Sequence, residues 1–288
     1  MTPTQFSVLQ VPNEEDEAWR RALFAVAIAK GWKYYEEWGG ETVALDPEFG
    51  GLMLTGADNA TGLPPEQWLV ITTSPQQAIS TIAKRYGADE KQAIVQASDR
   101  FAMADALVKR GSLLASSQDE VIAIPGLEPA CRANHPEFFN ENVGADPADT
   151  DGPLDFYRSL PVSEAAKALW PANMLTYPGS RIEETDDGVC VTLVGRRRLL
   201  TQGPHIMLPA GRWVLTTEIT LDAPVAVALR IEWGSSVLEP TLRANGKYEI
   251  KMITDQAERF RSDLSIQLLV PVLHGEMTIH GSRLERQA

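Results

Sequence analysis

From Val189 onward the chain alternates apolar and polar residues at every second position, and the pattern continues for nearly a hundred residues. Trp213 and Leu215, for example, share one phase, and Thr216 and Glu218 share the other. Residues two apart lie on the same face of a β-strand. At least six such runs, each with one apolar face and none with a helical period, predict an antiparallel β-sandwich.

The first 130 residues have a different pattern, in which helical segments alternate with short apolar runs. One helix is well defined at both ends: Ser74 is placed to cap it, Pro75 suits its first position, and Gly87 follows its end. Strands and helices in alternation predict a small α/β domain. The other expected elements are a helix over 13–30, one or two helices over 89–111, and strands over 42–45, 52–55, 68–73 and 120–124.

Residues 131–180 read as a connection between these two parts. The stretch from Asp146 to Pro153 is acidic and rich in turn formers, and a short helix is expected over 163–169, ending before Trp170-Pro171. The predicted class is therefore α+β multidomain. It comprises an α/β domain at 1–130, a connection with a short helix at 131–180 and a β-sandwich domain at 181–288.

The net charge of −13 belongs almost wholly to the first part, because residues 1–160 hold 24 acidic and 12 basic residues. This acidity repels phosphate groups, so the charge of the first part predicts neither nucleic-acid binding nor general binding to anionic membranes. The one basic cluster is Arg196-Arg197-Arg198, whose side chains would alternate between faces of a strand. No apolar run reaches the roughly 18–20 residues of a membrane-spanning helix, so no membrane insertion is expected.

Two features bear on the compartment. The two cysteines, Cys131 and Cys190, are far apart, which suits a reducing compartment or a protein that is indifferent to redox conditions. The first residues carry no basic segment followed by an apolar one, so a secretory signal is not expected. The sequence thus predicts synthesis in the cytoplasm without a signal peptide. Action outside a cell would require another exit, such as release within a phage-like particle.

The sequence carries no motif of a nucleotide-binding, hydrolase or zinc-protease site. Cys131 and His135 have helical spacing, but a structural zinc site needs four ligands in a recognisable layout. No metal, cofactor or catalytic residue is therefore predicted. The lack of motifs favours a non-catalytic protein without excluding an enzyme.

One segment resembles a known kind of module. It runs from Gly195 to Leu215, with Gly203-Pro204-His205-Ile206, Leu208-Pro209-Ala210-Gly211 and Arg212-Trp213 at its centre. It is similar to a stretch of the jelly-roll modules that accompany bacterial polysaccharide-related proteins, which are in turn similar to carbohydrate-binding modules. The resemblance covers about residues 185–288 and implies that this part is a jelly-roll-like β-sandwich that binds a glycan.

Glycan recognition needs planar polar side chains for sugar hydroxyls and aromatic faces for sugar rings. The polar phase of one expected strand carries Arg230 and Glu232, and Trp233 ends that strand before Gly234. Gln202 and His205 flank Gly203-Pro204, which we expect to separate two strands. These five residues are the predicted glycan site, although Trp213, Trp233 and Tyr248 share the phase of the aliphatic core.

The function predicted from the sequence is recognition of a bacterial surface or capsular polysaccharide by a non-catalytic protein. The chain could belong to a phage-like particle, with residues 1–130 attached to a protein partner and the sandwich facing the glycan. Two alternatives stay open. One is a divergent glycosyltransferase-type enzyme with an accessory sandwich, and the other is a purely structural assembly protein.

Overall fold

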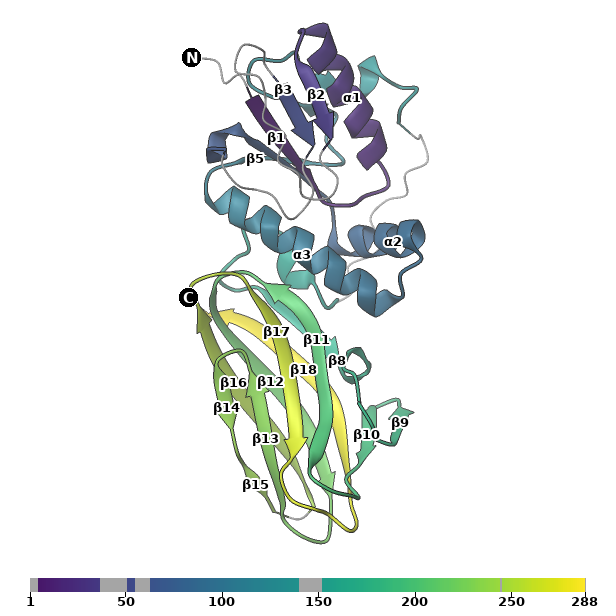
Figure 1. Cartoon of the computed structure of the whole chain (residues 1–288), viewed down its shortest axis with the longest axis vertical. Coiled ribbons are helices and arrows are strands. Elements are labelled where there is room, and N and C mark those ends of the chain that lie inside the picture. The colour runs from purple at the N-terminus through teal and green to yellow at the C-terminus, as the bar shows by residue number, and fades with distance from the viewer. Residues whose placement is uncertain (1–4, 37–50, 55–62, 140–151, 244, 288) are drawn as a thin grey trace. The chain divides into compact units, whose positions relative to one another are not determined.

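A computed structural model describes residues 5–36, 51–54, 63–139, 152–243 and 245–287. The chain divides into two compact units, Met1–Asp149 and Thr150–Ala288. The first is an α/β unit and the second an antiparallel β-sandwich, so the predicted fold class is confirmed (Figure 1). The strand expected over 42–45 lies outside the described residues, as does most of the acidic stretch that begins at Asp146.

The N-terminal unit is built on a five-stranded parallel sheet of order β2-β3-β1-β4-β5. Both faces of this sheet are covered, as is usual for parallel strands: Phe6 and Val8 of β1 pack with α1, while their neighbours Ser7 and Leu9 are buried on the opposite face. The larger elements of the unit are β1 (Gln5–Gln10), α1 (Asp16–Ala29), β2 (Lys33–Glu36), β3 (Gly51–Leu54), β4 (Trp68–Thr72), α2 (Pro75–Tyr86), α3 (Glu90–Lys109) and β5 (Leu113–Ser116).

The helix ends follow from local sequence. Ser74 adopts an extended backbone and its hydroxyl accepts a hydrogen bond from Gln77 N at 3.2 Å, while Gly87 ends α2 in the left-handed region at φ 61°. Asp89 caps α3 in the same way, through Gln92 N at 2.9 Å. The helix predicted after Ser74 is thereby confirmed at both ends.

A buried ion pair between Arg132 and Glu15 connects the segment around residue 132 to the start of α1. The guanidinium of Arg132 donates to both carboxylate oxygens of Glu15, whose side chain is only 2% exposed, and to the carbonyl of Ser117. Arg132 also lies over the rings of Trp19 and Phe139, at 5.2 and 4.7 Å from their centroids. Its hydrogen bonds to Glu15 raise the pKa of Arg132 above its usual value. This cluster holds residues 117–132, with the hairpin β6 (Val121–Ile122) and β7 (Ala130–Cys131), against α1.

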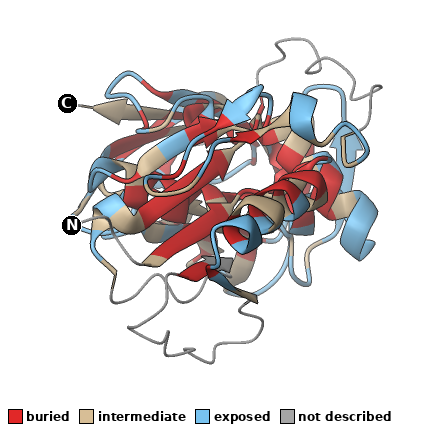
Figure 2. Ribbon diagram, turned by 90° about the horizontal axis from the view of Figure 1, so that it is seen from above, coloured by how far each residue is buried: buried red, intermediate tan, exposed pale blue. Residues whose placement is uncertain are grey.

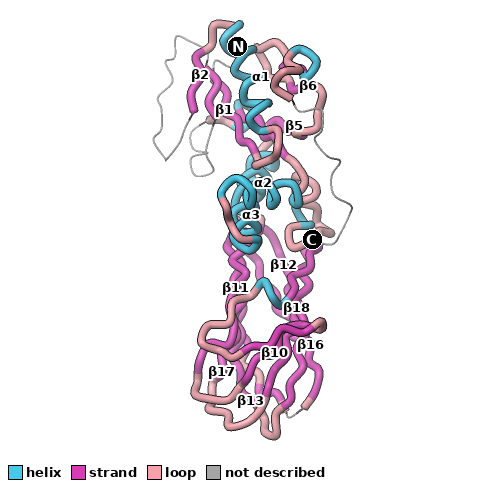
Figure 3. The backbone as a smooth tube through the Cα atoms, turned by 90° about the vertical axis from the view of Figure 1, so that its right-hand side faces the viewer, coloured by secondary structure: helices cyan, strands magenta, loops and turns pink. Residues whose placement is uncertain are grey.

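The C-terminal unit has two antiparallel sheets. One has the order β16-β12-β18-β10-β9, with β8 also paired to β18; the other has the order β11-β17-β13-β14, with β15 paired to β13. The two layers are visible in Figure 3. The strands are β8 (Lys167–Pro171), β9 (Ile182–Thr185), β10 (Gly188–Thr192), β11 (Arg198–Leu208), β12 (Gly211–Asp222), β13 (Val227–Trp233), β14 (Ser236–Leu238), β15 (Thr241–Leu242), β16 (Gly246–Gln256), β17 (Phe260–Leu268) and β18 (Glu276–Gln287).

The core of the sandwich comes from the apolar phase of these strands. Trp213 and Leu215 of β12 and Ile231 of β13 are at most 1% exposed. Figure 2 shows that the buried residues follow the strands and helices. Phe156 extends the core, because its ring packs edge-on against Trp213 with centroids 5.5 Å apart. The residues after 150, expected in a connection, are therefore part of the sandwich.

Two local expectations are wrong. The helix expected over 163–169 is absent, and β8 pairs instead with β18 through Lys167↔Glu285 and Leu169↔Arg283. The reason is that Ala168 and Trp170 are buried while Lys167 and Leu169 are not, which is a strand period. Gly203-Pro204 does not separate two strands either, since β11 runs through both residues.

Candidate functional site

The sheet that contains β11, β17 and β13 has an outer face of polar side chains in register. Gln202 pairs across the sheet with Ser265, and Ser265 pairs with Glu232. In the next row, Gln267 pairs with Arg230. Neighbouring strands are about 4.8 Å apart, so a row over three strands spans roughly 10 Å, the scale of a short oligosaccharide. We call these five residues the polar face.

Three members of the polar face are available for a ligand. Within the described residues, the side chains of Gln202, Ser265 and Gln267 make no hydrogen bond to protein, and each is partly exposed. A side-chain amide offers two donors and one acceptor oxygen, and a hydroxyl offers one donor and an acceptor. Sugar hydroxyls are both donors and acceptors, so this set of groups matches their chemistry.

The charged members of the polar face, Arg230 and Glu232, are held in place by hydrogen bonds to each other and to Glu239. Arg230 Nε donates to Glu232 Oε1 at 2.6 Å, and a terminal nitrogen of Arg230 donates to Glu239 Oε1 at 3.1 Å. The hydrogen bond that Arg230 donates to Glu232 raises the pKa of Arg230 above its usual value. These contacts orient one guanidinium and two carboxylates, and each group keeps free edges because their side chains are at least a third exposed.

A bulge in β11 turns His205 onto the same side of the sheet. The register passes from Pro204↔Asp263 to Ile206↔Ser262, so His205 is an extra residue, and its φ of 64° lies in the left-handed region. Asp263 Oδ1 accepts from Gly203 N at 2.8 Å, and its other oxygen lies 3.4 Å from His205 Nδ1. The bulge therefore places an imidazole and a carboxylate at the edge of the polar face.

The structure thus brings together four of the five residues predicted from the sequence, Gln202, His205, Arg230 and Glu232. Trp233 points the other way: it is fully buried, and its Nε1 donates to Ser262 Oγ at 2.6 Å. The residues that the sequence analysis did not name are Ser265, Gln267, Asp263 and Glu239. The polar phase of β17 marks Ser265 and Gln267 once the order of the strands is known.

No Trp, Tyr or Phe side chain among the described residues of the C-terminal unit is exposed enough to present a whole ring face to a sugar. Within residues 152–243 and 245–287, Phe156, Tyr157, Trp170, Trp213 and Trp233 are at most 3% exposed. The remaining aromatics of these residues, Tyr177, Tyr248 and Phe260, are half-buried. A ligand on the polar face would therefore be held mainly by hydrogen bonds.

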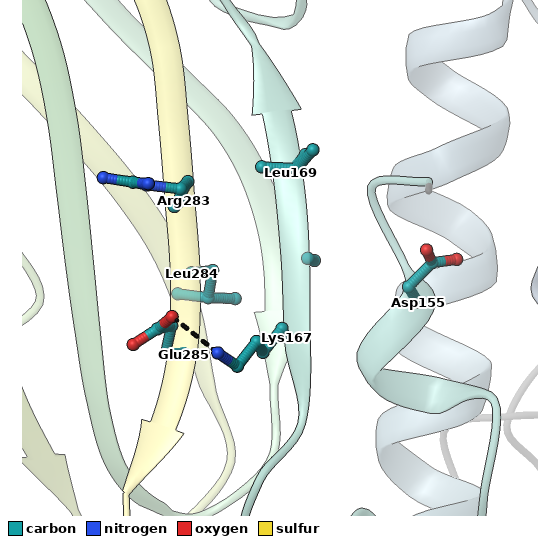
Figure 4. A pocket seen from close by; sticks show the side chains of 7 residues that line it. Asp155, Lys167, Leu169, Arg283, Leu284 and Glu285 are labelled. Atoms are coloured by element: carbon teal, nitrogen blue, oxygen red, sulfur yellow. Dashed lines mark hydrogen bonds and ion pairs between the residues drawn. The ribbon is translucent and has the colours of Figure 1, made fainter. Parts of the chain in front are cut away.

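The opposite sheet carries a hollow of about 210 Å³ between β8, β18 and the turn at Asp155 (Figure 4). Its charged side chains are compensated within the protein. Lys167 Nζ lies 3.0 Å from Glu285 Oε1, Asp155 pairs with Arg158 at 2.9 Å, and Arg283 lies 3.4 Å from Glu218. The hollow offers fewer free polar groups than the polar face.

The N-terminal unit has a different candidate position, where the strand order reverses between β1 and β4. Ligands of doubly wound sheets bind outside the carboxyl ends of the strands at such a point. Here β1 leads into Asn13-Glu14-Glu15-Asp16-Glu17, and the nearby cations are already engaged, since Arg132 pairs with Glu15 and Arg85 with Asp16. A phosphate at this point would meet a negative surface.

Within the described residues, no group of three or more His, Cys, Asp or Glu side chains is arranged to hold a metal ion. No helix in the described part of the chain is long and apolar enough to cross a membrane.

No protein-family model matches the chain, and no curated protein matches it. Among solved structures, the chain is similar to the C-terminal carbohydrate-binding module of a laminarinase from Zobellia galactanivorans, with 14% identity over 42% of this chain and 99% of the module and a TM-score of 0.32. It is also similar to the xylan-binding module CBM15, with 12% identity over 43% of this chain and 99% of the module and a TM-score of 0.32.

A third similar structure is a carbohydrate-binding module of a Cellvibrio mixtus lichenase in complex with cellotriose. The identity is 14% over 42% of this chain and 98% of the module, with a TM-score of 0.28. All three of these structures are described as carbohydrate-binding modules. The ligands named for these modules are theirs and are not assigned to this chain.

Proposed function

We propose that the C-terminal unit binds a glycan on the polar face. The observation that carries this proposal is the register that aligns Gln202, Ser265 and Glu232 across three strands, with Arg230 and Gln267 beside them. These groups are planar or small, partly exposed, and rich in both donors and acceptors. The solved structures to which the chain is similar are described as carbohydrate-binding modules, which is consistent with this role.

The test measures binding of the full chain to xylan, laminarin and a bacterial capsular polysaccharide by affinity electrophoresis. Replacing Gln202 or Glu232 by alanine removes hydrogen bonds to the ligand, and we expect each variant to bind about tenfold more weakly. Lys167→Ala on the opposite sheet is the matched control and should bind normally. The proposal fails if the wild-type chain binds none of these polysaccharides, or if only Lys167→Ala reduces binding.

We further propose that the ligand is a bacterial surface or capsular polysaccharide and that the chain is part of a phage-like particle. The chain would be made in the cytoplasm and released within the particle, attached through the N-terminal unit. Support for an attachment surface comes from α1, where Phe24 and Ile28 are 44% and 52% exposed. The ring of Phe24 meets Tyr34 at 4.8 Å beside a hollow of about 310 Å³.

This attachment predicts that the double variant Phe24→Ser/Ile28→Ser no longer co-sediments with the particles from a producing strain, because it removes the apolar contact surface. Folding is checked by circular dichroism, and glycan binding by the C-terminal unit should persist. Normal co-sedimentation of the variant, or absence of the wild-type chain from purified particles, would contradict the attachment.

The alternative of a glycosyltransferase-type enzyme draws on the reversal of strand order between β1 and β4. The carboxylates at 14–17 weigh against a nucleotide there. The cations beside them, Arg132 and Arg85, are already paired with Glu15 and Asp16. Glycan recognition by the polar face is the function that the geometry supports better.

A further inference from the structure

Several loops of the C-terminal unit meet at the end where β17 ends and β18 begins (Figure 1). Gly195 and Val272 exchange two backbone hydrogen bonds, and Ala223 N donates to Asn245 Oδ1 at 2.8 Å. Gly275 lies so close to Ala223 that a Cβ on Gly275 would be 2.8 Å from the Cβ of Ala223. The loops therefore form one continuous surface, the loop surface, made of residues 193–197, 222–226, 243, 245–247 and 269–276.

The loop surface presents aliphatic side chains to solvent. Leu273 is 79% exposed, the largest exposed fraction among the large hydrophobic side chains of the described residues. Val225, Val194 and Val270 are 54%, 49% and 42% exposed. Single exposed apolar residues are ordinary, but several on adjacent loops mark a contact surface.

The same loops are basic in a chain whose net charge is −13. Arg196, Arg197, Arg243 and Lys247 are all exposed, and none of them has an ion-pair partner in the part of the chain that the structure describes. Arg196 and Arg197 lie in a bend before β11 and not within a strand, so they are not forced onto opposite faces. The carboxylates in these loops are Asp222 and Glu276, so positive charge prevails.

We propose that the loop surface docks onto an anionic lipid bilayer. Cations beside exposed aliphatic tips match such a surface, because the charges meet lipid phosphates while the tips enter the boundary between headgroups and acyl chains. A soluble polyanion would engage the arginines but would leave Leu273 and Val225 in water. This docking is peripheral and requires no membrane-spanning helix.

The test is co-sedimentation of the full chain with vesicles of phosphatidylcholine alone or with a quarter phosphatidylglycerol, at low and high salt. We expect binding only to the anionic vesicles and release by salt. Each arginine near the surface contributes about 1 kcal/mol, so Arg196→Gln/Arg197→Gln should weaken binding about 30-fold. Leu273→Ser should weaken binding as well, at an unchanged net charge.

Arg212→Gln/Arg259→Gln is the control, because it removes two exposed arginines at the opposite ends of the strands from the loop surface and leaves the same net charge. It should bind like the wild type, and so should Gln202→Ala, which tests glycan binding on a separate face. Lack of binding to anionic vesicles overturns the proposal, as does equal weakening by the control. It is also overturned if the chain binds alginate with the same dependence on Arg196 and Arg197 and Leu273→Ser has no effect.

Discussion

Replacing Arg132 by methionine is expected to lower the free energy of unfolding of the N-terminal unit by about 3–5 kcal/mol, because it leaves the carboxylate of Glu15 buried without a partner. Glu15 is 2% exposed, and Arg132 supplies hydrogen bonds to both of its oxygens. The loss also removes the contacts of the guanidinium with Trp19 and Phe139. Denaturant unfolding followed by circular dichroism measures the effect.

The double variant Arg132→Met/Glu15→Gln should be less destabilised than Arg132→Met, since neither charge is then left alone. Arg110→Met is the matched control at an exposed arginine of the same unit and should change stability by less than about 0.5 kcal/mol. If Arg132→Met and Arg110→Met had equal small effects, the ion pair would not be what holds residues 117–132.

Replacing Trp233 by alanine is expected to lower the free energy of unfolding of the C-terminal unit by about 3–5 kcal/mol, as for other fully buried tryptophans. Trp233→Phe keeps a ring but leaves the hydroxyl of Ser262 without its donor, and it should cost about 1–3 kcal/mol. Val237→Ala, at a half-exposed valine on the neighbouring strand, should have little effect.

This result separates a core role for Trp233 from a binding role. A core residue changes the unfolding midpoint, while glycan binding per folded molecule stays normal in the milder Trp233→Phe variant. The opposite pattern, normal stability with lost binding in both variants, would show that Trp233 reaches the ligand and that its placement in the core is incorrect.

The sandwich could be predicted from sequence because half-buried antiparallel strands carry a strict two-residue period. The strand β1 could not, although it lies at the centre of the N-terminal sheet. Phe6, Val8 and Leu9 are all fully buried, and a strand buried on both faces shows no alternation. A short apolar run near the start of a chain then looks like many other segments.

For the candidate site too, the sequence predicts which face of a strand each residue lies on, but not which strands lie side by side. The phase of β13 assigns Arg230 and Glu232 to the outer face and Trp233 to the core face, because Trp233 shares the phase of Ile231. The alternation within one strand does not show which other strand pairs with it. Ser265 and Gln267 lie more than thirty residues from their partners on β13, so only the folded sheet shows that they belong to the polar face.

The placement of β8 determines where the folded module begins. Ala168 and Trp170 of β8 cover one side of β18, and Phe156 packs against Trp213. A fragment starting at residue 185, where the resemblance to known modules starts, would lose β8 and most of β9. It would also lose Phe156, which covers the indole of Trp213. A fragment starting at residue 152 keeps every described element of the sandwich, so the recombinant domain boundary belongs there.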